Sequence, residues 1–370
     1  MDSLTQATLG AAIGGAVLGR RLGRKSLVIG AALGTLPDLD VVIDYGDAVA
    51  NVTYHRGFSH SLFVLSALAI LLALLTRRLA PARDISLSRW WWLFCLCLIT
   101  HPLLDALTTY GTQLWWPLSV SRPSANPLVF IIDPVYTLPL AVGVIAGLVL
   151  GSEGGIQRAA RWALVLSSLY LLMSLGIRSW VDDRVTPALA EHQLDQAPRL
   201  IQPTPFNILL WRVTAIDQNR YAETTVGVFD GDTPPVIEIF QRGAELEPIA
   251  QATAKGQRLN WFAGPFLSYD IMYHQGHQWL MATDLRLGFP GYHPFRFAIA
   301  ERTDDTAEWL SLVPTQQISE EGQRSSLARL FQRLTSPTPP LCISELIAPR
   351  FRSEIPEECL KPHTASPPKN

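Results

Sequence analysis

Apolar segments dominate the first half of the chain. The four longest cover residues 58–76, 90–108, 134–151 and 160–177. A transmembrane helix needs about 20 mainly apolar residues, so these segments predict four full spans. Trp90, Trp91 and Trp92 open the second segment, as expected for aromatic side chains at a membrane interface.

Two shorter apolar segments come before these spans. Residues 7–19 and 26–37 are rich in glycine and alanine and flank a basic turn. Neither is long enough for a full span. Their glycines, such as Gly10 and Gly14 or Gly30 and Gly34, follow the small-xxx-small spacing that lets membrane helices pack closely. We therefore expect a short helical hairpin that is tightly packed or re-entrant.

Beyond residue 180 the pattern changes to short β-branched and aromatic runs separated by Gly, Pro, Asn or Asp, which predict strands. The clearest runs are Trp211–Ile216, Thr224–Phe229, Val236–Phe240, Leu267–Tyr273 and Trp279–Leu285. The predicted fold class is an α-helical membrane bundle followed by a soluble β-rich domain. The predicted domains are 1–180, 181–335 and an extended tail, 336–370, rich in Pro, Ser and Glu.

Basic residues orient the predicted bundle. Three connections carry them: the turn from Arg20 to Lys25, the link with Arg77, Arg78, Arg83 and Arg89, and the link with Arg158 and Arg161. Short connections rich in Lys and Arg face the cytoplasm. Residues 38–60, the segment 101–105, the loop 109–133 and the C-terminal domain should then lie on the exported face.

Composition agrees with a membrane protein, because 48% of the residues are hydrophobic and only 17% are charged. The formal net charge is −2 and no basic block alternates with aromatics, so a nucleic-acid partner is not expected. Cys95 and Cys97 lie in an apolar run and are predicted to pack in the interior. Cys342 and Cys359 lie in the polar tail, where they could form a disulfide in an oxidising compartment.

Three polar motifs flank or interrupt the apolar segments: 37–40 (PDLD), 55–61 (HRGFSHS) and 101–105 (HPLLD). A charged side chain at membrane depth costs at least a few kcal/mol, so ionisable residues there usually pair, bind a metal or line a polar cavity. The motifs hold three His and three Asp on one predicted membrane face. This pattern predicts one shared metal site.

The first and third motifs each allow a simpler interpretation. Asp38 and Asp40 would point the same way in an extended segment, although Asp38 could simply cap a helix end. His101 and Asp105 share a helix face if the helix continues through Pro102. Otherwise they would be unrelated polar residues in an apolar helix.

The second motif places His55 in a loop and His60 in the first turn of the next helix, with Ser59 at its N-cap. Gly57 would let the backbone fold back between the two histidines. Arg56 could hold an anionic group such as a phosphate through its planar fork. The alternative is a pair of interfacial histidines with a snorkelling arginine.

The ordered motifs resemble those of the YdjM-like family of inner-membrane proteins. The resemblance rests on 36–40 (LPDLD), 55–61, 101–105, and Thr112 followed by 114–117 (LWWP), and it covers roughly residues 1–180. The resemblance implies a multi-pass protein of the inner membrane. Members of this family are classed as metal-dependent hydrolases and are also described as LexA-binding. Some relatives have His where this chain has Gln6 and Val41, so the metal shell would be leaner here or completed by water.

Two functions are compatible with these observations. The first is a membrane-embedded metal-dependent hydrolase that acts on a phosphoester-bearing or lipid-like substrate at the exported face, with Arg56 and Asp105 in catalysis. Mixed His and Asp ligation suits zinc best, or a pair of divalent ions, with manganese or magnesium as alternatives. The predicted ligands are Asp38, Asp40, His55, His60, His101 and Asp105. The second function is a non-catalytic membrane regulator or scaffold with a structural metal and a β domain that binds an unknown protein partner.

Overall fold

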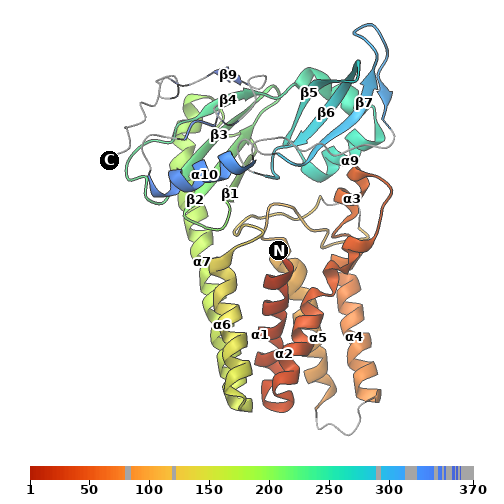
Figure 1. Cartoon of the computed structure of the whole chain (residues 1–370), viewed down its shortest axis with the longest axis vertical. Coiled ribbons are helices and arrows are strands. Elements are labelled where there is room, and N and C mark those ends of the chain that lie inside the picture. The colour runs from red at the N-terminus through yellow and green to blue at the C-terminus, as the bar shows by residue number, and fades with distance from the viewer. Residues whose placement is uncertain are drawn as a thin grey trace. The chain divides into compact units, whose positions relative to one another are not determined.

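A computed structural model describes residues 1–79, 85–118, 122–288, 293–312 and 323–336, with short pieces at 341–343, 346, 352–354, 356 and 359. Arg83 and most of the predicted tail, 336–370, lie outside the described residues. The chain forms two compact units (Figure 1). The first comprises Met1–Gly46, Ala50–Gly176 and Pro205–Ile208, and the second comprises Asp47–Val49, Ile177–Thr204 and Leu209–Asn370.

The first unit is helical. Its elements are α1 (Ser3–Leu22), α2 (Arg24–Thr35), the 3-10 helix η1 (Pro37–Val42), α3 (Ala48–Tyr54), the 3-10 helix η2 (Phe58–His60), α4 (Leu62–Leu79), α5 (Leu87–Asp105), α6 (Pro134–Leu150) and the first part of α7 (Glu153–Glu191). The longer helices run roughly side by side (Figure 1). Asp133 caps α6, because its carboxylate accepts the backbone N–H groups of Val135 and Tyr136.

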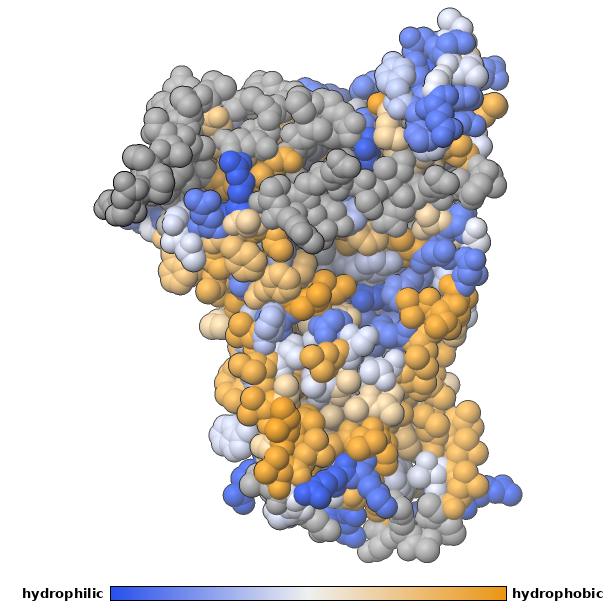
Figure 2. Space-filling view, in the orientation of Figure 1, coloured by the Kyte–Doolittle hydropathy of each residue, from blue (hydrophilic) through white to orange (hydrophobic). Residues whose placement is uncertain are grey.

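Three helices of the described chain are long and apolar enough to cross a membrane: Leu62–Leu79, Leu87–Asp105 and Gly154–Glu191. Exposed apolar side chains such as Leu74 on α4 and Leu172 on α7 face outward, and Figure 2 shows this apolar surface along the helices. The prediction of a helical membrane region followed by a β-sheet domain is confirmed. Four full spans are not, because α6 is a shorter apolar helix of 17 residues.

α1 and α2 form a closely packed hairpin. A Cβ on Gly10 would collide with the carbonyl oxygen of Gly30 and lie 2.9 Å from the Cα of Gly34. The predicted small-residue packing is therefore confirmed, since only glycine fits where the two backbones meet. α1 begins earlier than the pattern predicted, because the Asp2 carboxylate caps it by accepting the Thr5 backbone N–H at 3.0 Å.

The second unit contains two antiparallel sheets. One has the strand order β1-β2-β3-β4-β9 and the other the order β5-β6-β7-β8. The strands are β1 (Arg199–Pro203), β2 (Leu210–Ile216), β3 (Arg220–Gly227), β4 (Glu238–Gln241), β5 (Leu267–His274), β6 (His277–Asp284), β7 (Arg296–Arg302), β8 (Leu310–Ser311) and β9 (Arg352–Glu354). The helices are η3 (Ala244–Leu246), α8 (Glu247–Gln251), α9 (Ala254–Ala263) and α10 (Gln323–Thr335). All five predicted runs overlap strands, whereas β1 and the strands after β6 were not predicted.

The core of the second unit combines large apolar side chains with buried charges. Trp211 and Phe240 are almost completely buried. Burial lowers the pKa of the enclosed His293 to about 3, and the nearby Arg212 adds to this effect. Cys342 and Cys359 form a disulfide, which confirms the pairing that the sequence left open.

Candidate metal centre

Four side chains from the three predicted motifs meet inside the helical unit. Asp38 belongs to η1, His60 to η2, and His101 and Asp105 to the last two turns of α5. One ligand atom from each lies within 4.8 Å of all the others. The side chains of His60, His101 and Asp105 are fully buried, and that of Asp38 is 19% exposed. α5 continues through Pro102, so His101 and Asp105 share a helix face as expected.

The distances within this cluster are short and similar. The two histidine Nε2 atoms lie 3.2 Å apart. Asp105 Oδ2 is 3.2 Å from His60 Nε2 and 3.5 Å from His101 Nε2. Asp38 Oδ1 is 3.5 Å from His60 Nε2 and 3.3 Å from His101 Nε2. The four atoms therefore surround a common point.

Hydrogen bonds on the far side of each ring determine its tautomer. His101 Nδ1 lies 2.6 Å from the carbonyl oxygen of Gly34, which can only accept, so Nδ1 carries a proton. The Ser59 hydroxyl lies 2.7 Å from Asp40 Oδ2 and 2.8 Å from His60 Nδ1. It donates to the carboxylate and therefore accepts from His60 Nδ1–H. Each neutral ring then presents its Nε2 lone pair to the centre of the cluster.

With both rings neutral, the cluster brings two imidazole lone pairs and two carboxylates together with no proton between them. Protonating both rings would place two positive N–H groups 3.2 Å apart. Asp105 Oδ2 is buried and has no hydrogen-bond partner among the described residues. A divalent cation would satisfy all four atoms at once, and histidines held through their other nitrogen are typical of metal sites. The cluster is a candidate metal-binding site.

Asp40 and His55 lie beside the cluster and contribute no atom to it. The segment around Asp38 and Asp40 is a 3-10 helix rather than the expected extended chain. Residues two apart in such a helix point about 120° away from each other, so only Asp38 faces the cluster. Asp40 instead lies 3.1 Å from His55 Nδ1. Burial alone would raise the pKa of Asp40, but its contacts with His55, Ser59 and the Arg56 backbone hold that pKa below its ordinary value.

Arg56 reaches the cluster from the loop between α3 and η2. Its Nε lies 3.4 Å from Asp105 Oδ2, and its guanidinium carbon lies 5.0 Å from the ring centre of Tyr110. The side chain is buried, and Nε and Nη1 have no hydrogen-bond partner in the described part of the chain. Its φ of 60° is uncommon for an arginine. Asp40 Oδ2 fixes this backbone by accepting the Arg56 N–H at 2.9 Å.

Residues that the sequence did not place at the site hold Asp105. Gln6 Nε2 donates to Asp105 Oδ1 at 3.0 Å and to the His101 carbonyl oxygen at 3.3 Å. The α-amino group of Met1 pairs with the same Oδ1. These contacts direct Oδ2 toward the cluster. In the sequence, Gln6 was singled out only by the family resemblance, which implied a histidine at this position in some relatives.

The predicted role of Ser59 as the N-cap of the next helix is wrong. Residues Phe58–His60 form η2, and Ser61 occupies the position before α4, where its hydroxyl accepts the Val64 N–H at 3.4 Å. This turn frees Ser59 to connect Asp40 with His60. Similarly, His60 precedes α4 rather than starting it.

A family model described as YdjM inner membrane protein matches residues 1–181. Inner membrane protein YbcI from Escherichia coli (strain K12) is 36% identical over 144 residues, which are 37% of this chain and 79% of that protein. The chain belongs to the YdjM inner membrane protein family.

A second relative extends the likeness beyond the helical unit. Uncharacterized protein YfhP from Bacillus subtilis (strain 168) is 25% identical over 311 residues, which are 80% of this chain and 89% of that protein. No solved structure matches the chain. The resemblance inferred from the motifs is confirmed, and this YdjM family protein is a membrane protein.

Proposed function

We propose that this YdjM family protein is a metal-dependent hydrolase with a zinc centre held by Asp38, His60, His101 and Asp105. The observation that supports it best is the convergence of four lone-pair atoms whose two imidazole rings are fixed by hydrogen bonds on their outer side. Such an arrangement matches the ligand chemistry of a mixed His and carboxylate zinc site.

The spacing of the ligand atoms supports zinc. Tetrahedral ligands at zinc bond lengths of about 2.0–2.1 Å lie about 3.3 Å from one another. Five of the six separations among the four ligand atoms are 3.2–3.5 Å, and the sixth, between Asp38 and Asp105, is within 4.8 Å. An octahedral site with bonds of about 2.1 Å, as magnesium prefers, needs adjacent ligands about 3.0 Å apart.

The donor set also supports catalysis rather than a purely structural metal. Structural zinc sites are built mainly from cysteine, often with histidine, whereas this cluster contains no cysteine. Bound zinc would lower the pKa of a water molecule and polarise the scissile group. Asp38, the partly exposed ligand, is on the side from which water and substrate would enter.

Arg56 supports an anionic substrate. Its buried guanidinium lies beside Asp105 and retains unused donors among the described residues. A planar fork of this kind binds phosphate oxygens in pairs. The proposed substrate is therefore a phosphoester-bearing molecule, and the location in a membrane protein favours a lipid-like one.

The proposed topology has four spans, with α6 as the fourth, and the metal site on the exported face. α6 is about 25 Å long, a little less than the roughly 30 Å of a bilayer core. Two hydrogen bonds connect the end of the first unit to the end of α5. The Ser174 hydroxyl donates to the carbonyl oxygen of Leu128. The Leu128 N–H donates at 2.8 Å to the carbonyl oxygen of Leu107, which follows α5. The chain therefore leaves the helical unit at the site end. The Cys342–Cys359 disulfide favours an oxidising, exported location for the C-terminal domain.

A non-catalytic scaffold with a structural metal is the second candidate. Four protein ligands at tetrahedral spacing favour it, because catalytic zinc usually has three protein ligands and an open position. In this case the metal would hold the three motifs together, and the β-sheet unit would bind a protein partner.

Metal analysis and hydrolysis assays on the purified full-length protein separate these candidates. The hydrolase predicts one zinc per chain and turnover of a phospholipid or isoprenoid-phosphate substrate. His60→Ala should lose both metal and turnover, whereas Arg56→Gln should keep the metal and lose turnover. Arg89→Gln, which changes an exposed arginine at the start of α5, is the matched control. Full zinc content in the His60 variant would refute the metal site, and a zinc-loaded wild type without turnover on the whole panel would favour the scaffold.

A further inference from the structure

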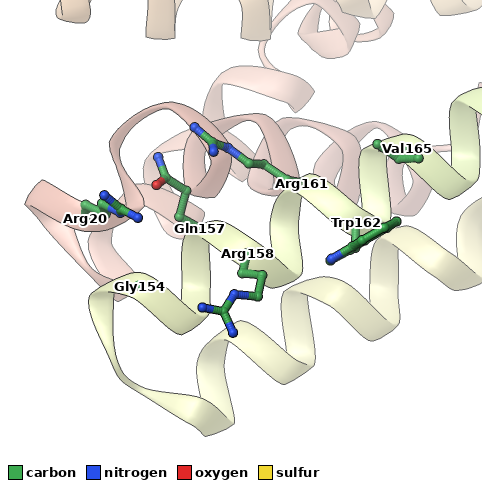
Figure 3. A pocket seen from close by; sticks show the side chains of 7 residues that line it. All are labelled: Arg20, Gly154, Gln157, Arg158, Arg161, Trp162 and Val165. Carbon is green, nitrogen blue, oxygen red and sulfur yellow. The ribbon is translucent and has the colours of Figure 1, made fainter.

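A second polar site lies at the other end of the helical unit, between the end of α1 and the start of α7. A cavity of about 290 Å³ there is lined by Arg20 from α1 and by Arg158, Arg161, Trp162 and Val165 among the residues of α7. Figure 3 shows Arg20 and Arg161 on either side of Gln157, with Arg158 nearby. The four α7 residues follow a 3, 1, 3 spacing and so share one helix face.

The three arginines of this cavity are uncompensated. Arg20, Arg158 and Arg161 are exposed and make no ion pair or hydrogen bond with any residue in the described ranges. None of the described residues that line the cavity carries a carboxylate. Three like charges around one small volume repel one another, and a bound anion would remove that repulsion.

The cavity has a fixed wall. Gln157 is buried, and its Nε2 donates to the Ala16 carbonyl oxygen at 2.9 Å, which ties α7 to α1. A Cβ on Gly19 would lie 3.3 Å from the Gln157 backbone nitrogen, so α1 and α7 are in contact at the residues that precede Arg20 and Arg158. The two helices that carry the arginines are therefore packed against each other.

An apolar groove lies next to this cavity on the same helices. A second cavity of about 410 Å³ includes Ile13, Ala16 and Val17 of α1 and Leu164, Ser168 and Leu171 of α7. Val17 lies one turn before Arg20, and Leu164 lies one turn after Arg161. From Arg161 to Leu171 the groove extends about 15 Å along the helix axis. Arg20 and Arg161 thus lie within one helical turn of residues that line an apolar groove.

We propose that this α1–α7 groove binds one anionic phospholipid, with its phosphate on the three arginines and an acyl chain in the apolar groove. Basic pockets between membrane helices bind anionic lipid head groups in this way, and arginine forks bind phosphate oxygens in pairs. Trp162 is 62% exposed at the mouth, as expected of a side chain at the membrane interface. The neighbouring apolar groove favours a lipid over free phosphate. The inference does not depend on the proposed hydrolase activity.

The test uses the full-length protein in detergent, titrated with phosphatidylglycerol, phosphatidylcholine of the same chain length, or inorganic phosphate, with binding followed by native mass spectrometry and thermal unfolding. Phosphatidylglycerol should bind one per chain and raise the unfolding temperature, and the other two probes should not do so at the same concentration. Arg20→Gln, Arg158→Gln and Arg161→Gln combined should weaken phosphatidylglycerol binding at least tenfold.

A matched variant removes the same charge at the same end without touching the cavity. It combines Arg77→Gln, Arg78→Gln and Arg89→Gln, at the end of α4 and the start of α5 (Figure 1), and should change binding less than twofold. Leu164→Trp, which fills the groove and leaves the arginines, should also weaken binding, and it keeps the test valid if the triple variant does not fold. Equal losses in both triple variants, equal binding of the two lipids, or equal binding of inorganic phosphate would each overturn the proposal.

Discussion

Replacing Ser59 by alanine should weaken metal binding without removing a ligand. The Ser59 hydroxyl donates to Asp40 Oδ2 at 2.7 Å and accepts from His60 Nδ1 at 2.8 Å. Alanine removes both bonds, while Asp40 keeps the backbone N–H of Arg56. The His60 ring can then carry its proton on Nε2, the atom that faces the cluster, and it loses its fixed orientation.

The size of the effect follows from these two bonds. Loss of an outer hydrogen-bond partner of a metal-binding histidine typically lowers metal affinity 10- to 100-fold, or about 1.4–2.7 kcal/mol. Because Ser59 connects His60 to a buried carboxylate, we expect a loss of about 30-fold, in the middle of that range. Ser59→Thr keeps the hydroxyl and should retain most of the affinity.

The assay is a zinc titration of the full-length protein in competition with a chelator of known affinity, together with circular dichroism to show that the fold is intact. Ser88→Ala is the matched control, because Ser88 is exposed at the start of α5 and bonds to Ser86 rather than to the site. A Ser59→Ala affinity within twofold of the wild type would show that Ser59 does not set the His60 tautomer. An equal loss in the Ser88 variant would show a general effect on stability.

Three other measurements test the fold. Gly30→Ala should destabilise the α1–α2 hairpin by about 1–3 kcal/mol, because its Cβ would collide with a facing carbonyl of α1, while Gly176→Ala, with open space around it, should be nearly neutral in thermal unfolding. The β-sheet unit should lose stability as the pH falls below 6.5, by up to about 1.4 kcal/mol per pH unit. The reason is that burial lowers the pKa of His293 to about 3 in the folded state, so the ring is neutral when folded and protonated when unfolded. In urea unfolding, His293→Phe should flatten this pH dependence. Thiol counting on denatured protein purified without reductant should find two free cysteines, since Cys342 and Cys359 are paired, and four would contradict the disulfide.

The hydrophobic pattern predicted the helical unit well, because membrane-like helices must be long and apolar and close helix packing requires glycine. The convergence of the three motifs was also predictable. Ionisable residues at membrane depth need partners, and the alternation of the helices returned 37–40, 55–61 and 101–105 to one end. The structure then brought Asp38, His60, His101 and Asp105 together.

The sequence did not predict which residues of the motifs form the cluster and which lie beside it. This division depends on local backbone geometry: a 3-10 turn directs Asp38 and Asp40 to different neighbours, and the loop before His60 contains Arg56 with a positive φ. Neither feature has a periodic signal in the sequence. The 39-residue α7 was also underestimated, because its second part is polar enough to be hidden from a search for apolar spans.

The packing of the glycine-rich α1–α2 hairpin determines part of the geometry of the candidate metal cluster. Gly34 lies at the end of α2, where backbone carbonyls have no partner within the helix, and its carbonyl oxygen accepts the His101 Nδ1–H. The same glycine lacks a Cβ where the Gln6 backbone of α1 passes, which allows the Gln6 side chain to bond to Asp105. Close packing of α1 on α2 therefore orients one histidine and one carboxylate of the cluster at the same time. For this reason a packing change such as Gly30→Ala should weaken zinc binding as well as stability, although it touches no ligand.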